Sequence, residues 1–252
     1  MRRMLLIGIG AGDPEYVTQQ AVRALNEVDV FFVMEKGEEK DDLVALRREV
    51  CERFIEDESY RIVAVRDPER DRTAAAYASA VDDWRRERAQ IWERLIGDEL
   101  DEGGVGAILV WGDPSLYDST LTIIDSILTA GRVRFDVEVI PGISAVAALC
   151  ARHAIALNRV GEAVHITTGR RLAREGLPQN APDVVVMLDA HCAFAALRDD
   201  DLDIYWGAYL GTPDEILVAG AVDDVADEIA RVRAAARERK GWIMDTYLLR
   251  RR

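Results

Sequence analysis

Short apolar runs alternate along this chain with longer segments in which apolar residues recur every three to four positions. The short runs predict buried strands, and the longer spacing predicts helices that turn one apolar stripe towards a sheet. Strands are expected over residues 4–9, 29–34, 60–65, 105–111, 135–140, 163–168, 184–188, 204–210 and 242–249. Helices are expected over residues 15–28, 41–55, 73–102, 144–152 and 223–238, with another through 121–128 that stops at Gly131. This alternation is typical of parallel sheets with helices on their faces.

The long charged helix expected over residues 73–102 needs one apolar stripe that packs on the sheet. At helical spacing this stripe consists of Tyr77, Val81, Trp84, Ile91 and Leu95. We interpret these side chains as core residues and not as a cofactor-binding set.

The chain has 252 residues, which exceeds the usual size of one domain. A second series of strands and helices begins after Asn158. We therefore expect an α/β protein with two domains, residues 1–158 and 159–252. The first would contain the glycine-rich and Gly-Pro loops described below. No Pro- or Ser-rich linker separates the two, which indicates domains that pack tightly.

Charge and cysteine content narrow the classes of partner. There are 46 Asp and Glu against 32 Lys and Arg, for a net charge of −14. Nucleic acids and anionic membranes are normally met by basic surfaces, so we expect neither as a partner. The three cysteines include no Cys-x-x-Cys pair and the chain has only three histidines, which argues against a structural metal site and for a reducing compartment.

The first residues, MRRMLLIGIGAGDP, superficially resemble a secretion signal. Glycines and then Asp13-Pro14 break the apolar run, and no small-residue cleavage site follows. No run in the chain approaches the roughly 18 apolar residues of a membrane span. We therefore interpret this segment as the first strand of a cytoplasmic protein.

The loop Gly8-Ile9-Gly10-Ala11-Gly12-Asp13 follows the first strand and opens a helix. Its spacing is G-x-G-x-G, not the G-x-G-x-x-G of dinucleotide-binding folds, and Asp13 would put a carboxylate where a phosphate should bind. We interpret Asp13 as the cap and Pro14 as the first residue of that helix, which leaves room for a role at a cleft. Glu35, at the end of the second strand, lies where a dinucleotide-binding domain has the acidic residue that binds ribose. An NAD-dependent oxidoreductase therefore remains an alternative function.

Two further loops have similar chemistry, residues 111–117 (WGDPSLY) and 140–145 (IPGISA). Each follows the carboxyl end of a strand, the edge at which open α/β sheets bind ligands. A Gly-Asp-Pro turn or a serine cap alone says little. Three such loops at one sheet edge indicate a shared ligand-binding cleft.

In this order, GIGAGDPEYVT, WGDPSLY and PGISA resemble the tetrapyrrole methylase family, whose members transfer methyl from S-adenosylmethionine to corrin and sirohaem precursors. The resemblance runs nearly end to end and implies two α/β domains with the active-site cleft between them, usually in a homodimer. MEKGEEKDDLVALRREVCERFI, HITTGRRLAREGLPQNA and YWGAYLGTPDEILVAG resemble the branch that methylates C1 of precorrin-5 and releases acetate. Open alternatives are another corrin position, uroporphyrinogen III, diphthine, ribosomal RNA (which the acidic charge disfavours) and a tetrapyrrole carrier without activity.

The resemblance also implies site residues. Cofactor contacts would come from Trp111, Gly112, Asp113, Leu116, Tyr117, Ser144, Ala145, Met187 and Gly211. The first loop would face the tetrapyrrole through Gly10, Gly12 and Asp13.

Substrate carboxylates need local arginines in an acidic protein, because guanidinium groups bind carboxylates in a bidentate manner. The candidates are Arg152, Arg170 and Arg171, with Arg159 and Arg174 beside them, although a solvated helix start would explain the cluster 170–174 equally well. Acetate release needs acid–base help, for which Asp13, Glu35 and His165 qualify by type and location. The sequence does not select among these three.

Overall fold

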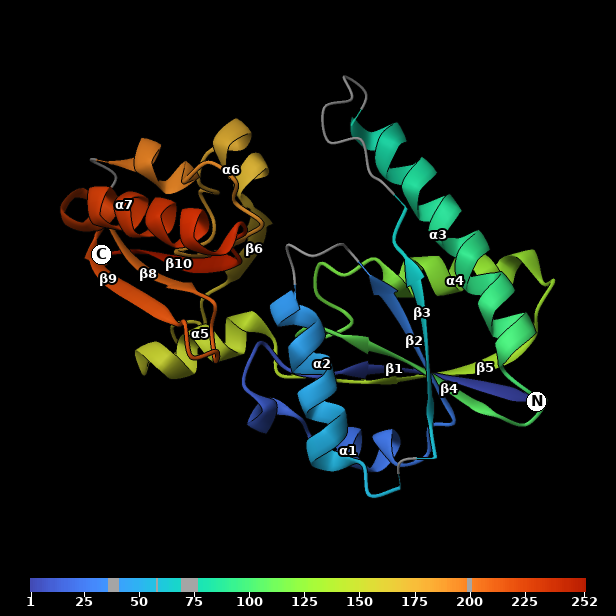
Figure 1. The fold of residues 1–252 in the computed structure, drawn as a ribbon. Coiled ribbons are helices and arrows are strands. Elements are labelled where there is room, and N and C mark those ends of the chain that lie inside the picture. Colours follow the sequence, from blue (N-terminus) through green and yellow to red (C-terminus); the bar gives the residue numbers. More distant parts are fainter. Residues whose placement is uncertain (36–40, 58, 69–76, 199–200) are drawn as a thin grey trace. The chain divides into compact units, whose positions relative to one another are not determined.

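The computed structural model describes residues 1–35, 41–57, 59–68, 77–198 and 201–252, without the side chains of 41–43 and 77–81. The chain forms two compact units (Figure 1). Unit 1 comprises Met1–Gly10 and Pro14–Ile143, and unit 2 comprises Ala11–Asp13 and Ser144–Arg252. This division precedes the boundary expected at residues 158–159. The reason is that the helix after Ser144 packs on the strands of unit 2.

Unit 1 is built on a parallel five-stranded sheet, as the alternation of strands and helices predicts. Its strands are β1 (Arg2–Gly8), β2 (Val30–Glu35), β3 (Arg61–Arg66), β4 (Val105–Val110) and β5 (Phe135–Ile140). The order across the sheet is β3-β2-β4-β1-β5, and every neighbouring pair is parallel. All five carboxyl ends therefore meet at one edge.

Helices cover both faces of this sheet, as Figure 1 shows. They are η1 (Pro14–Tyr16), α1 (Gln19–Leu25), α2 (Asp41–Phe54), α3 (Tyr77–Glu99) and α4 (Thr120–Ala130). One apolar core lies between the sheet and α1 with α2, around Ile7, Leu25 and Val50. A second core lies on the opposite face under α3 and α4, around Leu6, Ile96 and Ile124. The stop at Gly131 is confirmed, because Gly131 ends α4 with φ 67°, in the left-handed region that favours glycine.

The helix start expected at Asp13 and Pro14 is wrong. Residues 14–16 form only a short 3-10 turn, and α1 begins at Gln19. Thr18 is the cap, since its hydroxyl accepts a hydrogen bond from the amide of Ala21 at 3.0 Å. The glycine-rich loop is therefore followed by a 3-10 turn and not directly by the N-terminus of an α-helix.

The apolar stripe of α3 is shifted from the one expected. Trp92 and Ile96 are the fully buried positions of this helix, whereas Ile91 and Leu95 are half-buried. The shift follows from Arg88, which is buried one turn before Trp92 and pairs with the carboxylate of Asp67 at 2.9 Å. Trp84 is half-buried, and its indole donates to the carbonyl of Pro68. The side chains of Tyr77 and Val81, with residues 73–76 of the expected helix, lie outside the described part of the chain.

Unit 2 is a mixed sheet, so the parallel arrangement expected for the second half is wrong. Its strands are β6 (Val164–Thr168), β7 (Asp183–Met187), β8 (Leu202–Ala208), β9 (Ile216–Ala221) and β10 (Asp245–Arg251). The order is β6-β7-β10-β8-β9, and β6 with β7 is the parallel pair. Strand β9 was not expected from the sequence. It is a half-buried edge strand that returns from β8 through a short turn.

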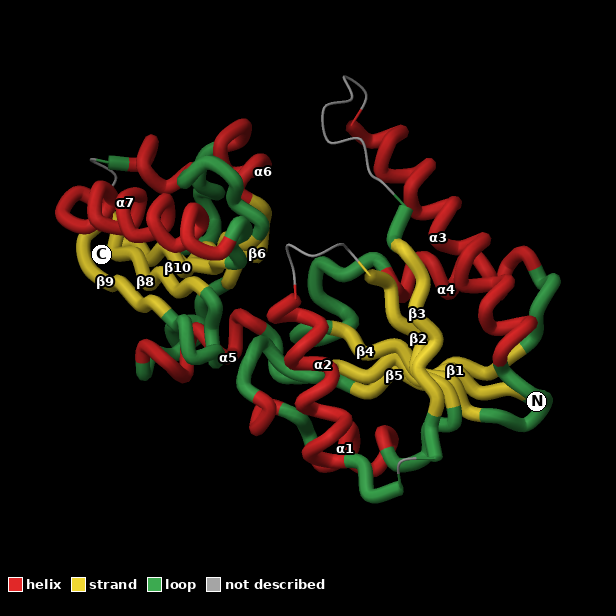
Figure 2. The backbone as a smooth tube through the Cα atoms, viewed as in Figure 1, coloured by secondary structure: helices red, strands yellow, loops and turns green. Residues whose placement is uncertain are grey.

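Two layers of helices enclose the sheet of unit 2 (Figure 2). On one face α6 (Gly169–Glu175), η3 (Ala193–Leu197) and α7 (Val222–Lys240) close a core around Trp206 and Tyr247. On the other face α5 (Ala145–His153) packs on β8, β9 and β10. Within the described residues, no helix combines the length and apolar character needed to cross a membrane.

Candidate functional site

The three loops singled out from the sequence meet at the carboxyl edge of unit 1. They follow β1, β4 and β5, which are neighbours in the sheet. Gly10 and Gly112 form a two-way backbone bridge, in which the Gly112 amide donates to the Gly10 carbonyl at 2.8 Å and the Gly10 amide donates back at 3.3 Å. The expectation that the loops share one edge is confirmed.

Glycine is required where these loops touch. A Cβ atom on Gly142 would lie 2.1 Å from the carbonyl oxygen of Gly112, and one on Gly8 would lie 2.6 Å from the amide nitrogen of Gly142. Both distances are far below van der Waals contact, and the atoms met are backbone atoms that cannot turn aside. The loops therefore pack main chain against main chain.

The carboxylate of Asp113 joins two of the loops. One oxygen accepts the amide of Gly142 at 2.9 Å, and the other accepts the amide of Ser115 at 2.8 Å together with the Ser115 hydroxyl. Partial burial raises the pKa of Asp113, but the bonds from Ser115 and Gly142 outweigh it and hold the pKa below its usual range. Asp113 is thus an ionised residue that fixes the shape of the loops, and its bonds leave it unsuited to act as a base.

We expect Asp113→Asn to destabilise unit 1 at neutral pH and to do so less at low pH. A lowered pKa means that the stabilisation is fully present above the unfolded pKa, near 4, and is lost as the pH falls through the folded pKa. Urea unfolding of both proteins at pH 7 and pH 3 measures this. Asp136→Asn, at an exposed position of β5, is the matched control because it removes a carboxylate outside these loops. A constant difference between wild type and Asp113→Asn at both pH values would contradict the assignment.

The other cofactor candidates in the loops after β4 and β5 differ in burial and in their hydrogen bonds. The indole nitrogen of Trp111 is buried and has no hydrogen-bond partner among the described residues, so a donor is left over at this edge. Leu116 is half-buried, and Tyr117 is exposed with φ 51°. Ser144 caps α5 by accepting the amide of Ala147 at 3.2 Å, with Ala145 as the first helical residue. Ser144 and Ala145 are counted with unit 2, and the others with unit 1.

Unit 2 brings its candidates to one edge as well. The registers of the strands align Thr168, Met187, Thr246 and Gly207 across four strands. Because β6, β7 and β8 run in the same direction, the residues that follow them share this edge. Met187 is half-buried there at the end of β7.

The Gly211 turn, which follows β8, contacts the tip of the glycine-rich loop within unit 2. Gly211 has φ 77°, and its amide donates to Glu215 at 2.9 Å. A Cβ atom on Gly12 would lie 2.3 Å from the carbonyl oxygen of Leu210. The proposed substrate residues Gly12 and Asp13 are therefore next to the turn of a proposed cofactor residue.

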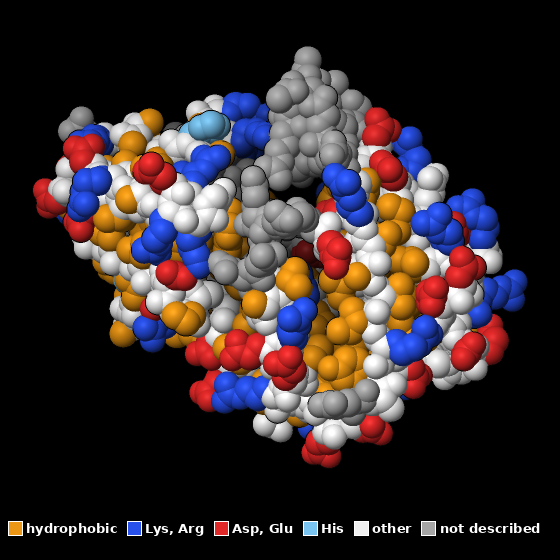
Figure 3. Space-filling view, in the orientation of Figure 1, with side chains coloured by type: hydrophobic (Ala, Val, Ile, Leu, Met, Phe, Trp, Pro, Cys, Tyr) orange, Lys and Arg blue, Asp and Glu red, His pale blue; other side chains and the backbone are white. Residues whose placement is uncertain are grey.

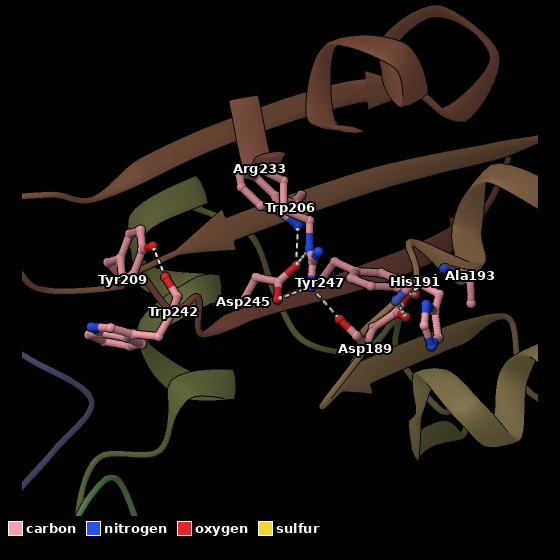
Figure 4. Close-up of polar contacts among 9 residues, drawn as sticks. All are labelled: Asp189, His191, Ala193, Trp206, Tyr209, Arg233, Trp242, Asp245 and Tyr247. Atoms are coloured by element: carbon pink, nitrogen blue, oxygen red, sulfur yellow. Dashed lines mark hydrogen bonds and ion pairs between the residues drawn. The ribbon is translucent and has the colours of Figure 1, made fainter. Parts of the chain in front are cut away.

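A buried polar network supports this edge, and the sequence did not reveal it (Figure 4). Asp189 accepts the amides of His191 at 2.9 Å and Ala193 at 2.6 Å and the hydroxyl of Tyr247 at 2.7 Å. Burial raises the pKa of Tyr247, and the charge of Asp189 adds to this, so the phenol stays a proton donor.

The guanidinium of Arg233 extends the network to α7. It donates to the carbonyl of Asp189 at 2.6 Å and pairs with Asp245 at 2.9 Å, and Asp245 also accepts the indole of Trp206. The network thus connects the turn after β7 to β10, β8 and α7 (Figure 4). The one sequence signal was an aspartate directly after an apolar strand.

The arginines expected to bind carboxylates already hold acidic neighbours. Arg152 pairs with Glu215 at 2.6 Å. Arg171 and Arg174 both pair with Glu175 on α6, and Arg170 is exposed on the same helix. Arg159 donates to the carbonyl of Arg251. Figure 3 shows acidic and basic side chains interspersed over the face in view. A substrate carboxylate would therefore exchange with existing pairs.

The acid–base candidates are not brought together in one unit. Glu35 is exposed at the end of β2 in unit 1, whereas Asp13 and His165 are counted with unit 2 and are half-buried. The register pairs His165 with Val184, which puts it on the face of the sheet that carries the core of unit 2. No described group of three or more His, Cys, Asp or Glu side chains is placed to hold a metal ion.

Comparisons with known proteins agree with this architecture. The precorrin-6A synthase [deacetylating] of Sinorhizobium sp is 50% identical over 251 residues, which cover 100% of this chain and 96% of the relative. The crystal structure of a Corynebacterium diphtheriae protein described as related to cobalamin synthesis (CobF) superposes with a TM-score of 0.85 at 39% identity, over 99% of this chain and 98% of that one.

A more distant structure has the same fold. The uroporphyrin-III C-methyl transferase of Thermus thermophilus, solved with S-adenyl homocysteine, has a TM-score of 0.60 at 19% identity, over 98% of this chain and 96% of that one. The family model for Tetrapyrrole (Corrin/Porphyrin) Methylases matches residues 3–226. A match of this extent, with two α/β units and the loops at their sheet edges, means that the chain belongs to the tetrapyrrole (corrin/porphyrin) methylase family.

Proposed function

We propose that this protein is a C-methyltransferase of cobalamin biosynthesis that methylates C1 of precorrin-5 with S-adenosylmethionine and releases acetate, giving precorrin-6A. The observation that carries the proposal is the 50% identity along the whole chain to a precorrin-6A synthase [deacetylating]. The sequence similarity to a precorrin-2 C(20)-methyltransferase is weaker, with 31% identity over 57% of this chain. The C1 methylase is therefore favoured over the other ring positions.

The fold of the glycine-rich loop disfavours the oxidoreductase alternative. A dinucleotide-binding loop delivers the pyrophosphate to the N-terminus of the helix that follows it. Here a 3-10 turn separates the loop from α1, which Thr18 caps. The amide of Gly10 is also engaged, because it donates to Gly112. The N-terminus of an α-helix therefore does not directly follow this loop, where a dinucleotide phosphate would need it.

The residues at the two edges fit S-adenosylmethionine as cosubstrate. The buried indole nitrogen of Trp111, beside the Gly112-Asp113 turn, is a donor that no described residue uses, and the close glycine contacts fix the backbone of the loops around it. We infer that the cosubstrate site also includes Gly112, Asp113, Leu116, Tyr117, Ser144, Ala145, Met187 and Gly211. When bound, the sulfonium supplies an activated methyl group with its own leaving group.

The protein contributes mainly positioning. Alignment of two bound reactants is worth about 7–11 kcal/mol of the barrier, so the chain needs to hold them rigidly and dry. Asp113 does this by fixing the loops, while Gly10, Gly12 and Asp13 approach the tetrapyrrole. Arg152, Arg170 and Arg171 would receive its carboxylates. Release of the acetyl unit requires addition of water to an acyl carbon, for which Asp13, Glu35 and His165 remain our candidates.

Mass spectrometry of an anaerobic reaction with precorrin-5 and methyl-labelled S-adenosylmethionine tests the activity. We expect one labelled methyl gained together with loss of the acetyl unit. Substitution of Asp13, Glu35 or His165 that retains label transfer but delays acetate release would identify the group that assists deacylation. A protein that binds S-adenosylhomocysteine but transfers no label to precorrin-5 would overturn the substrate. The homodimer implied by the family is tested by light scattering on the purified protein.

A further inference from the structure

Leu188 has a backbone conformation that a leucine rarely adopts. It directly follows β7 and has φ 53°, in the left-handed region where the side chain of a bulky residue crowds the backbone. The residue is also 64% exposed, so it gains little from packing within unit 2. Neither feature contributes to the stability of the fold.

The turn after Leu188 is fixed by the Asp189 network. The Asp189 side chain holds the amides of His191 and Ala193 and the Tyr247 hydroxyl, and Arg233 binds its carbonyl (Figure 4). Four hydrogen bonds to Asp189 thus determine the path of the chain directly beside Leu188. Strained residues that the surrounding structure holds in this way concentrate at ligand sites.

The location of Leu188 indicates which ligand it meets. It shares the edge of unit 2 with Met187, which precedes it, and with the Gly211 turn, which contacts Gly12. Met187 and Gly211 are, with Ser144 and Ala145, the residues of this unit that we assign to the cosubstrate. An exposed aliphatic side chain at that edge suits the apolar face of a purine nucleoside.

We propose that Leu188 packs its side chain against the adenosyl group of S-adenosylmethionine, and that Asp189 is the positioning residue that holds Leu188 in place. The inference rests on the proposed function. It adds to the cosubstrate site a side chain that the motif positions do not include, and it gives the buried network a role beyond holding the strands together.

Two substitutions at Leu188 separate ligand contact from stability. Leu188→Gly removes the side chain and relaxes the backbone, because glycine adopts positive φ readily. Calorimetric titration with S-adenosylhomocysteine should show about tenfold weaker binding, the loss expected for about half of a buried leucine contact, while Tm stays the same or rises. Leu188→Ala should weaken binding similarly with no gain in Tm. Ala154→Gly, at φ 53° and at the far end of α5 from Ser144, is the matched control and should leave binding unchanged.

A double-mutant cycle tests the positioning role. Tyr247→Phe removes one of the bonds to Asp189 and should weaken S-adenosylhomocysteine binding in the wild-type background but not in Leu188→Gly. A network that only stabilises the fold would lower Tm equally in both backgrounds and show no coupling in binding.

The outcomes are distinguishable. If the wild type fails to bind S-adenosylhomocysteine, the proposed function falls. If the wild type binds and both Leu188 variants bind within twofold of it, the adenosyl contact is overturned and the function stands. Unchanged S-adenosylhomocysteine affinity with a raised KM for precorrin-5 also overturns it, because Leu188 would then face the tetrapyrrole.

Discussion

Gly142→Ala is expected to slow methyl transfer about 100-fold while lowering the free energy of unfolding by about 3 kcal/mol. The added methyl would lie 2.1 Å from the carbonyl oxygen of Gly112, so the loop after β4 or the loop after β5 must move. That oxygen accepts the Gly10 amide, and Asp113 accepts the Gly142 amide, so the shift disturbs all three loops. A displacement of about 1 Å in a positioning site can cost about 100-fold in rate. Urea unfolding and single-turnover methyl transfer measure the two effects.

Gly97→Ala is the matched control for this experiment. Gly97 lies inside α3, and a Cβ atom there would meet Val133 at 3.4 Å, an ordinary contact. Alanine should stabilise the helix by about 0.5–1 kcal/mol and leave methyl transfer unchanged. If Gly142→Ala were as stable and as active as Gly97→Ala, the close packing of the loops would be refuted.

Asp189→Asn is expected to lower the stability of unit 2 by about 3–5 kcal/mol and Tm by about 10 °C. The carboxylate accepts three hydrogen bonds in a buried position, and an amide has one oxygen to offer. Its NH₂ group would face a donor, and buried donors without acceptors are costly. Thermal unfolding followed by circular dichroism measures the loss, and S-adenosylhomocysteine titration should show weakened binding.

Asp227→Asn provides the contrast. Asp227 pairs with Arg198 on the surface of α7, where the side chain is 88% exposed. Exposed pairs contribute about 0–1 kcal/mol, so this variant should be nearly as stable as the wild type. Equal destabilisation by both substitutions would show that net charge, not the buried network, determines the stability of unit 2.

Much of the architecture follows from local pattern. Strand β5 matches the expected residues 135–140, because apolar and acidic side chains alternate along FDVEVI with the two-residue period of a strand. The meeting of the three loops was also predictable, since parallel strands bring their carboxyl ends to one edge. Once the loops are known to meet there, the residue types in them indicate candidate site residues, such as Asp113 beside Gly112.

The failures have physical causes that sequence pattern does not contain. The start of α1 depended on whether Asp13 or Thr18 would cap it, and both residue types cap helices. The stripe of α3 shifted because Arg88 is buried against Asp67, a partner distant in sequence. The Asp189 network required the register of β7 against β10, which joins residues 58 positions apart. Tertiary pairing decides such features.

The position of β1 in its sheet has a consequence for biosynthesis. This first strand lies between β4 and β5, and its residues Met4, Leu6 and Ile7 are completely buried there. Strand β4 is made about 100 residues later, so at about 5–20 residues per second β1 waits about 5–20 s for its first neighbour. During that interval an apolar segment emerges from the ribosome with both of its edges unpaired. Nascent chains of this protein should therefore depend on chaperones that shield the first strand until β4 arrives.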